Sequence, residues 1–286
     1  MTAHAQQRHS SSPADLALSV RDLRFRPDKP ASREGDPVAR AWFVALSATF
    51  PRGEAMFIEA VKAHRDGTPP ALAAQIRDFI RQEVNHSREH LAFNRLAVEA
   101  GYDLTAIDAR VAALVGDAMA QPKIVVLAVT TALEHFTAVF AHEFLTRPEA
   151  FLEGAIGGPE LWLWHSVEEI EHKGVAYDTW LHATRDWSAA RRWRVRSQVM
   201  LGVTWRFLSN RYRDAQELLA QEGITGWRAH LGQLRYLFGQ PGILRRTFPA
   251  WLAYFKPGFH PWDHDDRALI AGWEAEFAQL PAEAAE

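Results

Sequence analysis

A stripe of apolar, acidic and imidazole side chains in segment 70–100 is the feature that most constrains how this chain can fold. Its members recur at alternating steps of three and four residues and therefore share one face of a helix. They are Ile76, Phe79, Glu83, His86, His90, Phe93 and Ala97. Segment 159–184 repeats the pattern with Trp162, His165, Glu169, His172, Ala176 and Thr179. In both segments, the face that should meet a core carries glutamate and histidine in its middle.

Each stripe contains a Glu-x-x-His pair, Glu83 with His86 and Glu169 with His172. The Cβ atoms of two residues at this spacing lie roughly 5 to 6 Å apart on the same helix face. Both side chains of a pair can therefore bind the same metal ion. The chain has no cysteine, so thiolate chemistry, disulfides and sulfur-ligated metals are excluded, and a metal must bind to histidine and carboxylate.

Single glutamates, Glu54 and Glu134, lie on the apolar faces of two further predicted helices. The order Glu, Glu-x-x-His, Glu, Glu-x-x-His is the ligand inventory of ferritin-like di-iron and di-manganese carboxylate proteins. Each isolated buried ion costs roughly several kcal/mol, whereas two divalent cations neutralise four carboxylates. We therefore expect two divalent metal ions. This donor set favours Fe, is compatible with Mn or a mixed Mn/Fe pair, and would suit Zn in a hydrolase.

Helical periodicity continues along most of the chain, and strand-like alternation is nearly absent. We expect helices at 37–64 (interrupted near Pro51 and Gly53), 70–100, 104–118, 122–146, 159–184, 187–222, 226–238, 242–255 and 264–279. This pattern predicts an all-α fold, a ferritin-like four-helix bundle that holds a dimetal carboxylate site and has a C-terminal helical extension. The predicted divisions are a polar N-terminal arm at 1–35, the bundle at 36–186, and a basic, aromatic-rich extension at 187–286.

A purely structural polar network is the competing interpretation, because about one Glu-x-x-His motif is expected by chance in a chain of this composition. Two motifs in phase with long apolar stripes favour the metal site. Within "HSVEEIEH", Glu168 competes with Glu169 because it lies four residues before His172. Its side chain points about 100° away from the stripe, so Glu169 is the expected ligand. Glu171 is expected outside the centre or on the surface.

The segments "FPRGE", "RQEVNHSREH", "TTALEHFTA", "WHSVEEIEHK" and "PGFHPWD" carry a family resemblance. With them, the chain resembles the bacterial, ferritin-like family described as predicted metal-dependent hydrolases, over about residues 36–265. The spacing of His165, Glu169 and His172 is also similar to the ligand helix of di-iron arylamine N-oxygenases. That second resemblance implies that His165 is a seventh ligand. The alternative role for His165 is a hydrogen-bond donor to one of the glutamates.

Two further histidines and one histidine-containing loop have open roles. His90 follows Glu83 by seven residues, the step at which radical-generating reductase small subunits, which share the ligand order, have a tyrosine. This difference argues against a stable tyrosyl radical, and leaves His90 as a ligand or as a residue that orients one. His135 adjoins Glu134 but points about 100° away, so a hydrogen-bonded core histidine is expected. The loop "FHPWDHDD" is expected to be a surface or lid segment, with metal binding as the alternative.

The expected function is that of a non-haem dimetal oxidase or oxygenase, with di-iron as the preferred centre, which uses O2 and an electron donor on a small organic substrate. One alternative is a metal-dependent hydrolase that uses a metal-bridged hydroxide. A second alternative is a non-enzymatic, ferritin-like iron-handling protein. The chain has no recognisable signal peptide and no run of about 18 uninterrupted apolar residues, so a cytoplasmic location is expected.

The C-terminal part of the chain is strongly basic. Residues 191–256 contain twelve Lys and Arg and three acidic residues, a net charge of +9, which leaves −12 for the rest of a chain whose net charge is −3. Arginine interleaved with tryptophan and phenylalanine suits the inner membrane surface or an anionic amphipathic ligand. The alternative is a helical cover whose arginines extend into solvent. Nucleic-acid binding is not expected, since no recognition motif accompanies the charge, and a homodimer is compatible with the sequence.

Overall fold

The computed structural model describes residues 11–13, 15–25, 33, 35–152, 156 and 158–277. Within these ranges the regular structure is helical and contains no strand, which confirms the predicted all-α class. The elements are α1 (Pro37–Ser47), α2 (Phe50–Lys62), α3 (Pro70–Glu99), α4 (Thr105–Met119), α5 (Lys123–Thr146), α6 (Pro148–Phe151), α7 (Glu160–His172), α8 (Val175–Ala183), α9 (Ala189–Gln221), α10 (Gly226–Leu234), a π-helical turn η1 (Arg235–Gly239), α11 (Ile243–Ala253), a 3-10 turn η2 (Pro261–Asp263) and α12 (Arg267–Phe277).

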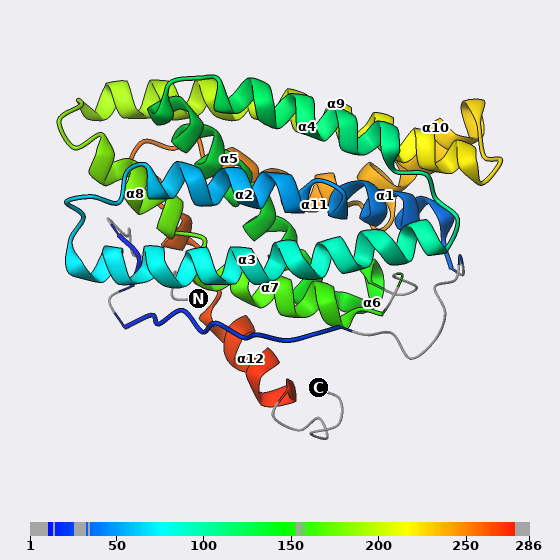
Figure 1. Ribbon diagram of the computed structural model, residues 1–286, viewed down its shortest axis with the longest axis horizontal. Helices are drawn as coiled ribbons and strands as arrows, with labels where there is room; N and C mark the ends of the chain where they lie inside the picture. The colour runs from blue at the N-terminus through cyan, green and yellow to red at the C-terminus, as the bar shows by residue number, and fades with distance from the viewer. Residues whose placement is uncertain are drawn as a thin grey trace, which may run out of the picture.

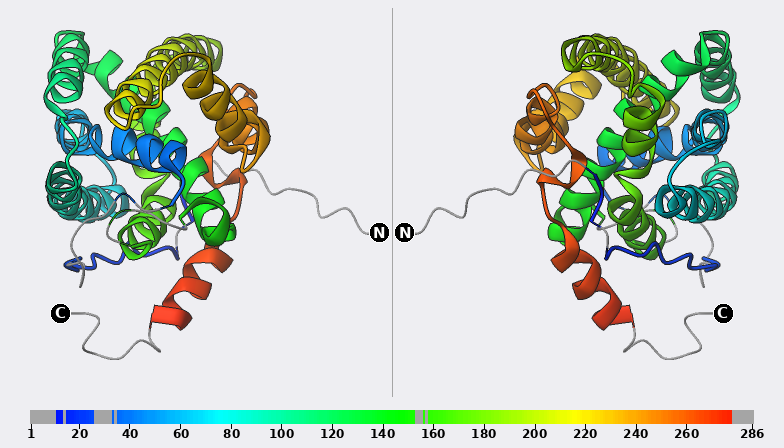
Figure 2. Two further views of the ribbon diagram at one scale, coloured as in Figure 1. Left: turned by 90° about the vertical axis from the view of Figure 1, so that its right-hand side faces the viewer. Right: turned by 90° about the vertical axis from the view of Figure 1, so that its left-hand side faces the viewer.

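A bundle of helices forms the centre of the molecule (Figure 1). α2 packs along α3 and α5 packs along α7, while α2 also contacts α5 and α3 also contacts α7. Figure 2 shows the bundle from its two ends, with α4 and α9 over one side of it and α12 on the opposite side. α2, α3, α5 and α7 are the four helices on which the sequence placed the candidate ligands.

Two of the predicted helices are interrupted. Segment 37–64 divides into α1 and α2 at Ala48 and Thr49, because Pro51 has no backbone N–H with which to continue the hydrogen bonds of α1 and is instead accommodated in the first turn of α2. Segment 159–184 divides into α7 and α8 at Lys173 and Gly174. At Gly174 a Cβ atom would overlap the Ser12 hydroxyl and would lie 3.1 Å from the Trp262 ring, so the chain needs glycine there.

Helix α5 is the centre of the packing. It contacts α2, α4, α7, α8, α9 and α11 and is apolar around most of its circumference. By length and composition alone it is the one helix in the described chain that could cross a membrane, and 72% of its most apolar window is buried inside the protein. Burial of this kind is typical of the central helix of a folded bundle, since neighbouring helices cover most of its surface.

Residues 16–25 lie extended along the outer side of α3 and α7 (Figure 1). The backbone N–H of Phe25 donates to Glu89 of α3 at 3.0 Å, and the Phe25 ring packs against Trp164 of α7 at 5.2 Å. The described part of the N-terminal arm is therefore attached to the two helices that carry the Glu-x-x-His pairs.

Candidate metal centre

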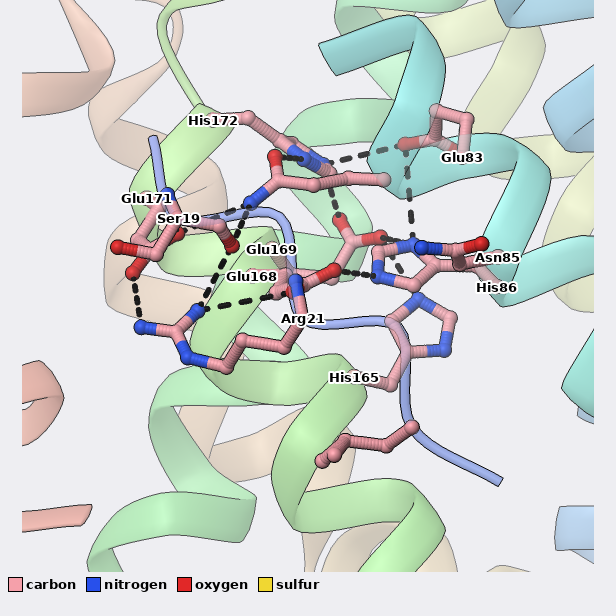
Figure 3. A network of polar contacts seen from close by, with 12 residues as sticks. Ser19, Arg21, Glu83, Asn85, His86, His165, Glu168, Glu169, Glu171 and His172 are labelled. Carbon is pink, nitrogen blue, oxygen red and sulfur yellow. Dashed lines mark hydrogen bonds and ion pairs between the residues drawn. The ribbon is translucent and has the colours of Figure 1, made fainter. Parts of the chain in front are cut away.

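Four helices bring the predicted ligand positions to one buried point, part of which is shown in Figure 3. The side chains are Glu54 from α2, Glu83 and His86 from α3, Glu134 from α5, and His165, Glu169 and His172 from α7. Each of them is at most 3% exposed. The structure therefore brings together all seven positions that the sequence selected.

One part of the cluster surrounds His172. Its Nε2 atom lies 3.2 Å from Glu83 Oε1, 3.4 Å from Glu169 Oε2 and 3.5 Å from Glu134 Oε2. A donor set of one imidazole and three carboxylates within such distances can hold a divalent cation, and Glu83, Glu169 and His172 offer ligand atoms within 4.8 Å of one another.

The other part surrounds His86 and His165. His86 Nδ1 lies 3.7 Å from Glu169 Oε1 and 4.0 Å from Glu83 Oε1. His165 Nε2 lies 2.7 Å from Glu169 Oε1 and 4.0 Å from Glu54 Oε1. The two oxygens of Glu169 thus face different histidines, and Glu83 contacts both parts of the cluster. This is the arrangement of two adjacent cation sites that share two carboxylates.

Eight buried atoms of the cluster have no hydrogen-bond partner among the protein atoms that the structure describes. They are Glu54 Oε1, both oxygens of Glu83, both oxygens of Glu134, Glu169 Oε2, His86 Nδ1 and His172 Nε2. Buried polar atoms are normally paired, because an unpaired one costs about 1–3 kcal/mol. All eight can act as metal ligands, so this donor set fits two divalent cations.

The electrostatics of the cluster agree with this fit. Burial raises the pKa of the carboxyls of Glu54, Glu83 and Glu134 well above the ordinary value. Burial lowers the pKa of His86 well below its ordinary value. At Glu169, burial would raise the pKa, but His172 and His165 outweigh it and lower the pKa. The protein alone thus disfavours most of the charges here, and divalent cations would stabilise the carboxylates in their ionised form.

His86 is held from outside the cluster by Glu168. His86 Nε2 lies 3.0 Å from Glu168 Oε2, while Glu168 Oε1 accepts a hydrogen bond from the Arg21 backbone N–H at 2.9 Å. The ring edge that carries Nδ1 is left facing Glu83 and Glu169. The structure thus places Glu169 in the cluster and Glu168 behind the histidine, the relation by which a carboxylate fixes the orientation of a metal-binding imidazole.

His172 is held in a similar way by Gln82. His172 Nδ1 lies 3.0 Å from Gln82 Oε1, and the Gln82 amide donates to Glu171 Oε2 at 2.9 Å. Glu171 is buried and also accepts from the Ser19 backbone N–H at 2.9 Å and from Arg21 Nη2 at 2.6 Å. Figure 3 shows Ser19 and Arg21 of the extended N-terminal segment beside Glu171 and Glu168.

His90 and His135, the two other histidines considered from the sequence, differ in their positions. His90 Nε2 lies 2.6 Å from His165 Nδ1, and His90 Nδ1 lies 2.8 Å from Ser47 Oγ, so His90 adjoins the cluster through His165. It also forms a possible ligand group with Glu54 and His165. His135 lies outside the cluster, where its Nε2 contacts the Ala250 carbonyl at 3.0 Å and burial lowers its pKa to about 4.

Several residues that support the centre were not among the sequence candidates. Ser87 Oγ donates to Glu54 Oε2 at 2.7 Å, and Gln82, Ser47 and Arg21 hold other members of the cluster as described above. Gln82 immediately precedes Glu83, and Ser87 immediately follows His86. Proximity to the Glu-x-x-His pair is therefore the one signal in the sequence for these two residues. Arg21 carried no such signal, because its contacts depend on how the N-terminal segment crosses α7.

A second group of possible ligand atoms lies where the loop before α12 meets α5, and it consists of His142, His264 and Asp266. The two Nδ1 atoms are each 2.9 Å from Asp266 Oδ1. Lys173 Nζ is only 2.6 Å from Asp266 Oδ2 and already supplies the positive charge. This group is therefore an ion-pair junction between α5, the end of α7 and the start of α12.

The fold and the cluster define an all-α protein with a buried carboxylate and histidine centre suited to divalent metals. The chain belongs to the family described as predicted metal-dependent hydrolases, whose model matches residues 19–265. The match begins earlier than the predicted residue 36 and so includes the segment containing Ser19 and Arg21. Searches of curated proteins and of solved structures gave no match. The resemblance to di-iron arylamine N-oxygenases stays a prediction.

Proposed function

We propose that the chain is a hydrolase that acts on a small organic substrate with two divalent cations at the buried centre. The observation that carries this proposal is the convergence of eight unpartnered carboxylate and imidazole atoms on one point. Membership of the metal-dependent hydrolase family supports it. The residues proposed to hold the cations are Glu54, Glu83, His86, Glu134, His165, Glu169 and His172.

Two divalent cations at such a centre supply Lewis acidity and lower the pKa of a bound water toward neutrality. The protein supplies orientation and exclusion of solvent. Glu168 and Gln82 keep His86 Nδ1 and His172 Nε2 directed at the centre. Phe50 covers the side formed by His90 and His165, with ring centroids 4.4 and 4.7 Å away, and limits the access of bulk water.

A second candidate function is O2-dependent oxidation, as a dimetal, preferentially di-iron, oxidase or oxygenase. It is favoured by the donor set itself, because oxygen and imidazole ligands without sulfur, arranged as two Glu-x-x-His pairs and two further glutamates, suit iron or manganese. This function requires an electron donor as well as O2. A non-enzymatic iron-handling protein would use the same donor set. The absence of turnover would distinguish it from the hydrolase and from the oxidase.

Replacement of Glu169 by alanine tests the centre. Both Glu169 oxygens face histidines of the cluster, so we expect Glu169→Ala to lose at least one of two bound metal equivalents. Metal content is measured on protein purified without added metal and again after loading. Glu160→Ala is the matched control, because Glu160 lies exposed in the first turn of the same helix. Unchanged metal content in Glu169→Ala would contradict the proposed centre.

The two enzymatic functions differ in their requirements. Hydrolysis predicts turnover of a small ester by the Zn2+-loaded protein under anaerobic conditions and without a reductant. Oxidation predicts no such turnover, together with a change in optical absorbance when the anaerobic Fe2+-loaded protein meets O2. The second pattern would overturn hydrolysis in favour of the oxidase.

A further inference from the structure

An apolar cavity shares Phe50 with the surroundings of the candidate metal centre. Its volume is about 580 Å³, within the range of small-molecule sites, and it lies between α2, α4, α5 and α9. Its walls are formed mainly by aliphatic and aromatic side chains, among them Met56, Phe57, Val125, Val129 and Val199. The cavity is elongated, because its lining on α5 extends from Val125 to Phe140, about 22 Å along the helix axis.

The cavity and the metal centre share two helices. Gly53 lines the cavity next to Glu54 on α2, and Leu133 lines it next to Glu134 on α5. Phe50 belongs to both, since it lines the cavity and packs against the rings of His90 and His165. None of the seven proposed metal ligands lines the cavity, and Phe50 stands between a ligand there and the rings of His90 and His165.

One end of the cavity contains an incompletely paired cation. Arg211 lines the cavity and is 1% exposed. Its Nη1 donates to the Ala45 carbonyl at 2.7 Å and its Nη2 pairs with Asp214, but its Nε has no partner among the described protein atoms. Arg206 and Asn210 line the cavity on the same helix. This end suits an anionic group, because a buried donor that lacks an acceptor favours a ligand that supplies one.

We propose that the cavity binds an amphiphile with one long unbranched hydrocarbon chain and an anionic head group, which makes such a molecule the substrate class of the proposed hydrolase. This inference rests on the proposed function for its catalytic part. The head group lies toward Arg206 and Arg211, and the chain lies along Met56, Phe57 and Val125. The bond to be hydrolysed is an ester that joins the chain to the head group, so that water adds its hydroxyl to the acyl carbon and its proton to the departing head-group oxygen. This bond would lie at the level of Gly53 and Leu133, which directly precede Glu54 and Glu134 in the sequence.

Binding is measured without catalysis, by displacement of the fluorescent fatty acid parinarate from the metal-free and the metal-loaded protein. We expect affinity to increase from octanoate through dodecanoate to hexadecanoate, because each buried methylene contributes roughly a fourfold gain. Hexadecanoate that fails to displace the probe, or an affinity independent of chain length, would overturn the proposal.

Two glycines give a matched pair of variants for the cavity. A Cβ atom at Gly202 meets nothing within 4 Å, and Gly202 lines the cavity. Gly116 is equally open but lies on the exposed surface of α4. We expect Gly202→Leu and Gly202→Phe to weaken hexadecanoate binding progressively, by at least tenfold for phenylalanine, and Gly116→Phe to leave it unchanged. Equal binding by the Gly202 and Gly116 variants would overturn the site.

Head-group recognition has its own comparison. Arg206→Gln should weaken hexadecanoate binding about tenfold and leave hexadecanol binding unchanged, and Arg213→Gln, an exposed arginine on the same helix, should affect neither. Equal loss for acid and alcohol would overturn the anionic head group. Metal content and turnover of p-nitrophenyl acetate are followed in every variant. Loss of chain binding with metal content retained is expected, whereas a wild-type protein without metal or turnover would refute the proposed function even if the chain binds.

Discussion

Glu168 and Glu169 are neighbours in the sequence and have different roles in the structure. Glu169 faces three histidines of the centre. Glu168 lies behind His86, and each of its two oxygens has one donor. When His86 Nδ1 binds a cation, the ring proton is on Nε2 and donates to Glu168 Oε2. The Arg21 backbone N–H donates to the other oxygen. Glu168 therefore has both oxygens occupied and works through His86 as a positioning residue.

We expect Glu168→Gln to weaken metal binding about 10- to 100-fold, the usual effect of removing a residue that orients a metal-binding histidine. A glutamine offers one acceptor oxygen, whereas His86 and Arg21 present two donors, so one donor would face the amide N–H group. Metal affinity is measured by competition with a chelator, and the thermal midpoint of unfolding reports on folding.

Glu89→Gln is the control for this change. Glu89 is also buried and also accepts a backbone N–H from the N-terminal segment, at Phe25, but it has no contact with the cluster. Its replacement should leave metal affinity unchanged. Similar metal affinity in Glu168→Gln and in the wild-type protein would show that Glu168 does not orient His86.

The helical stripes predicted the positions of the centre, and their periodicity explains why. A residue three or four positions from the last is fixed on the same face, so Glu83, His86, Glu169 and His172 could be placed from the sequence. Gln82 and Arg21 could not be placed in this way. Gln82 lies one residue off the stripe, and the contacts of Arg21 depend on packing between segments about 150 residues apart, which no local periodicity encodes.

At the scale of elements, helix positions were predictable and one interruption was not. Pro51 marks the boundary between α1 and α2 in the sequence, because proline limits the helix locally. The break between α7 and α8 has no comparable local signal. Gly174 lies at this break, and the close approach of Ser12 and Trp262 to it forms only in the folded chain.

Asp266 joins three elements, and its replacement tests how they are held together. It accepts from Lys173 Nζ at the end of α7 and from His142 of α5, and it directly precedes α12. Asp266→Asn leaves the buried Lys173 ammonium without its carboxylate, so we expect a loss of about 3–5 kcal/mol in the free energy of unfolding, measured by urea titration. Asp265→Asn removes an exposed carboxylate that pairs with Arg267 and should cost about 1 kcal/mol or less.

The effect of Asp266→Asn should depend on pH. Burial raises the pKa of the Asp266 carboxyl, but hydrogen bonds from His142 and His264 and the charge of Lys173 outweigh it and lower the pKa well below the ordinary value. A carboxyl with a depressed folded pKa stabilises the protein fully above its unfolded pKa, about 3.9, and loses this effect as the pH falls toward the folded value. The difference between variant and wild type should thus be largest near neutral pH and shrink below about pH 4. A constant difference would contradict this role.

At the scale of the whole molecule, charge and exposed apolar surface occur in the same part of the chain. Nine of the thirteen large apolar side chains exposed in the described ranges lie between Trp193 and Leu252. Residues 191–256 also carry the net charge of +9. Folding buries only part of this charge, because Arg196 and Arg211 are inside the protein. The surface that remains combines tryptophan with arginine, the composition that favours an anionic lipid interface.

We expect the protein to sediment with vesicles that contain phosphatidylglycerol and not with vesicles of phosphatidylcholine alone, and this binding should weaken as salt is added. Trp205 and Trp227 are 76% and 70% exposed, so Trp205→Ser combined with Trp227→Ser should reduce the bound fraction severalfold. Leu91→Ser is the control, because Leu91 is an exposed apolar residue on α3, outside the basic region. Equal binding to both kinds of vesicle, or equal loss in the control, would exclude a lipid-binding role for this surface.

Binding to an anionic interface would also explain why the cavity opens beside α9. Trp205 lies between Gly202 and Arg206, both of which line the cavity, so a lipid-bound α9 would place the cavity next to a source of long-chain amphiphiles. The vesicle and parinarate measurements can then be combined in one comparison. If the interface delivers the ligand, Trp205→Ser with Trp227→Ser should slow transfer of hexadecanoate from phosphatidylglycerol vesicles severalfold while leaving its equilibrium affinity in solution unchanged. Transfer at the wild-type rate would show that the lipid-binding surface does not deliver the ligand, and that the ligand enters the cavity from solution.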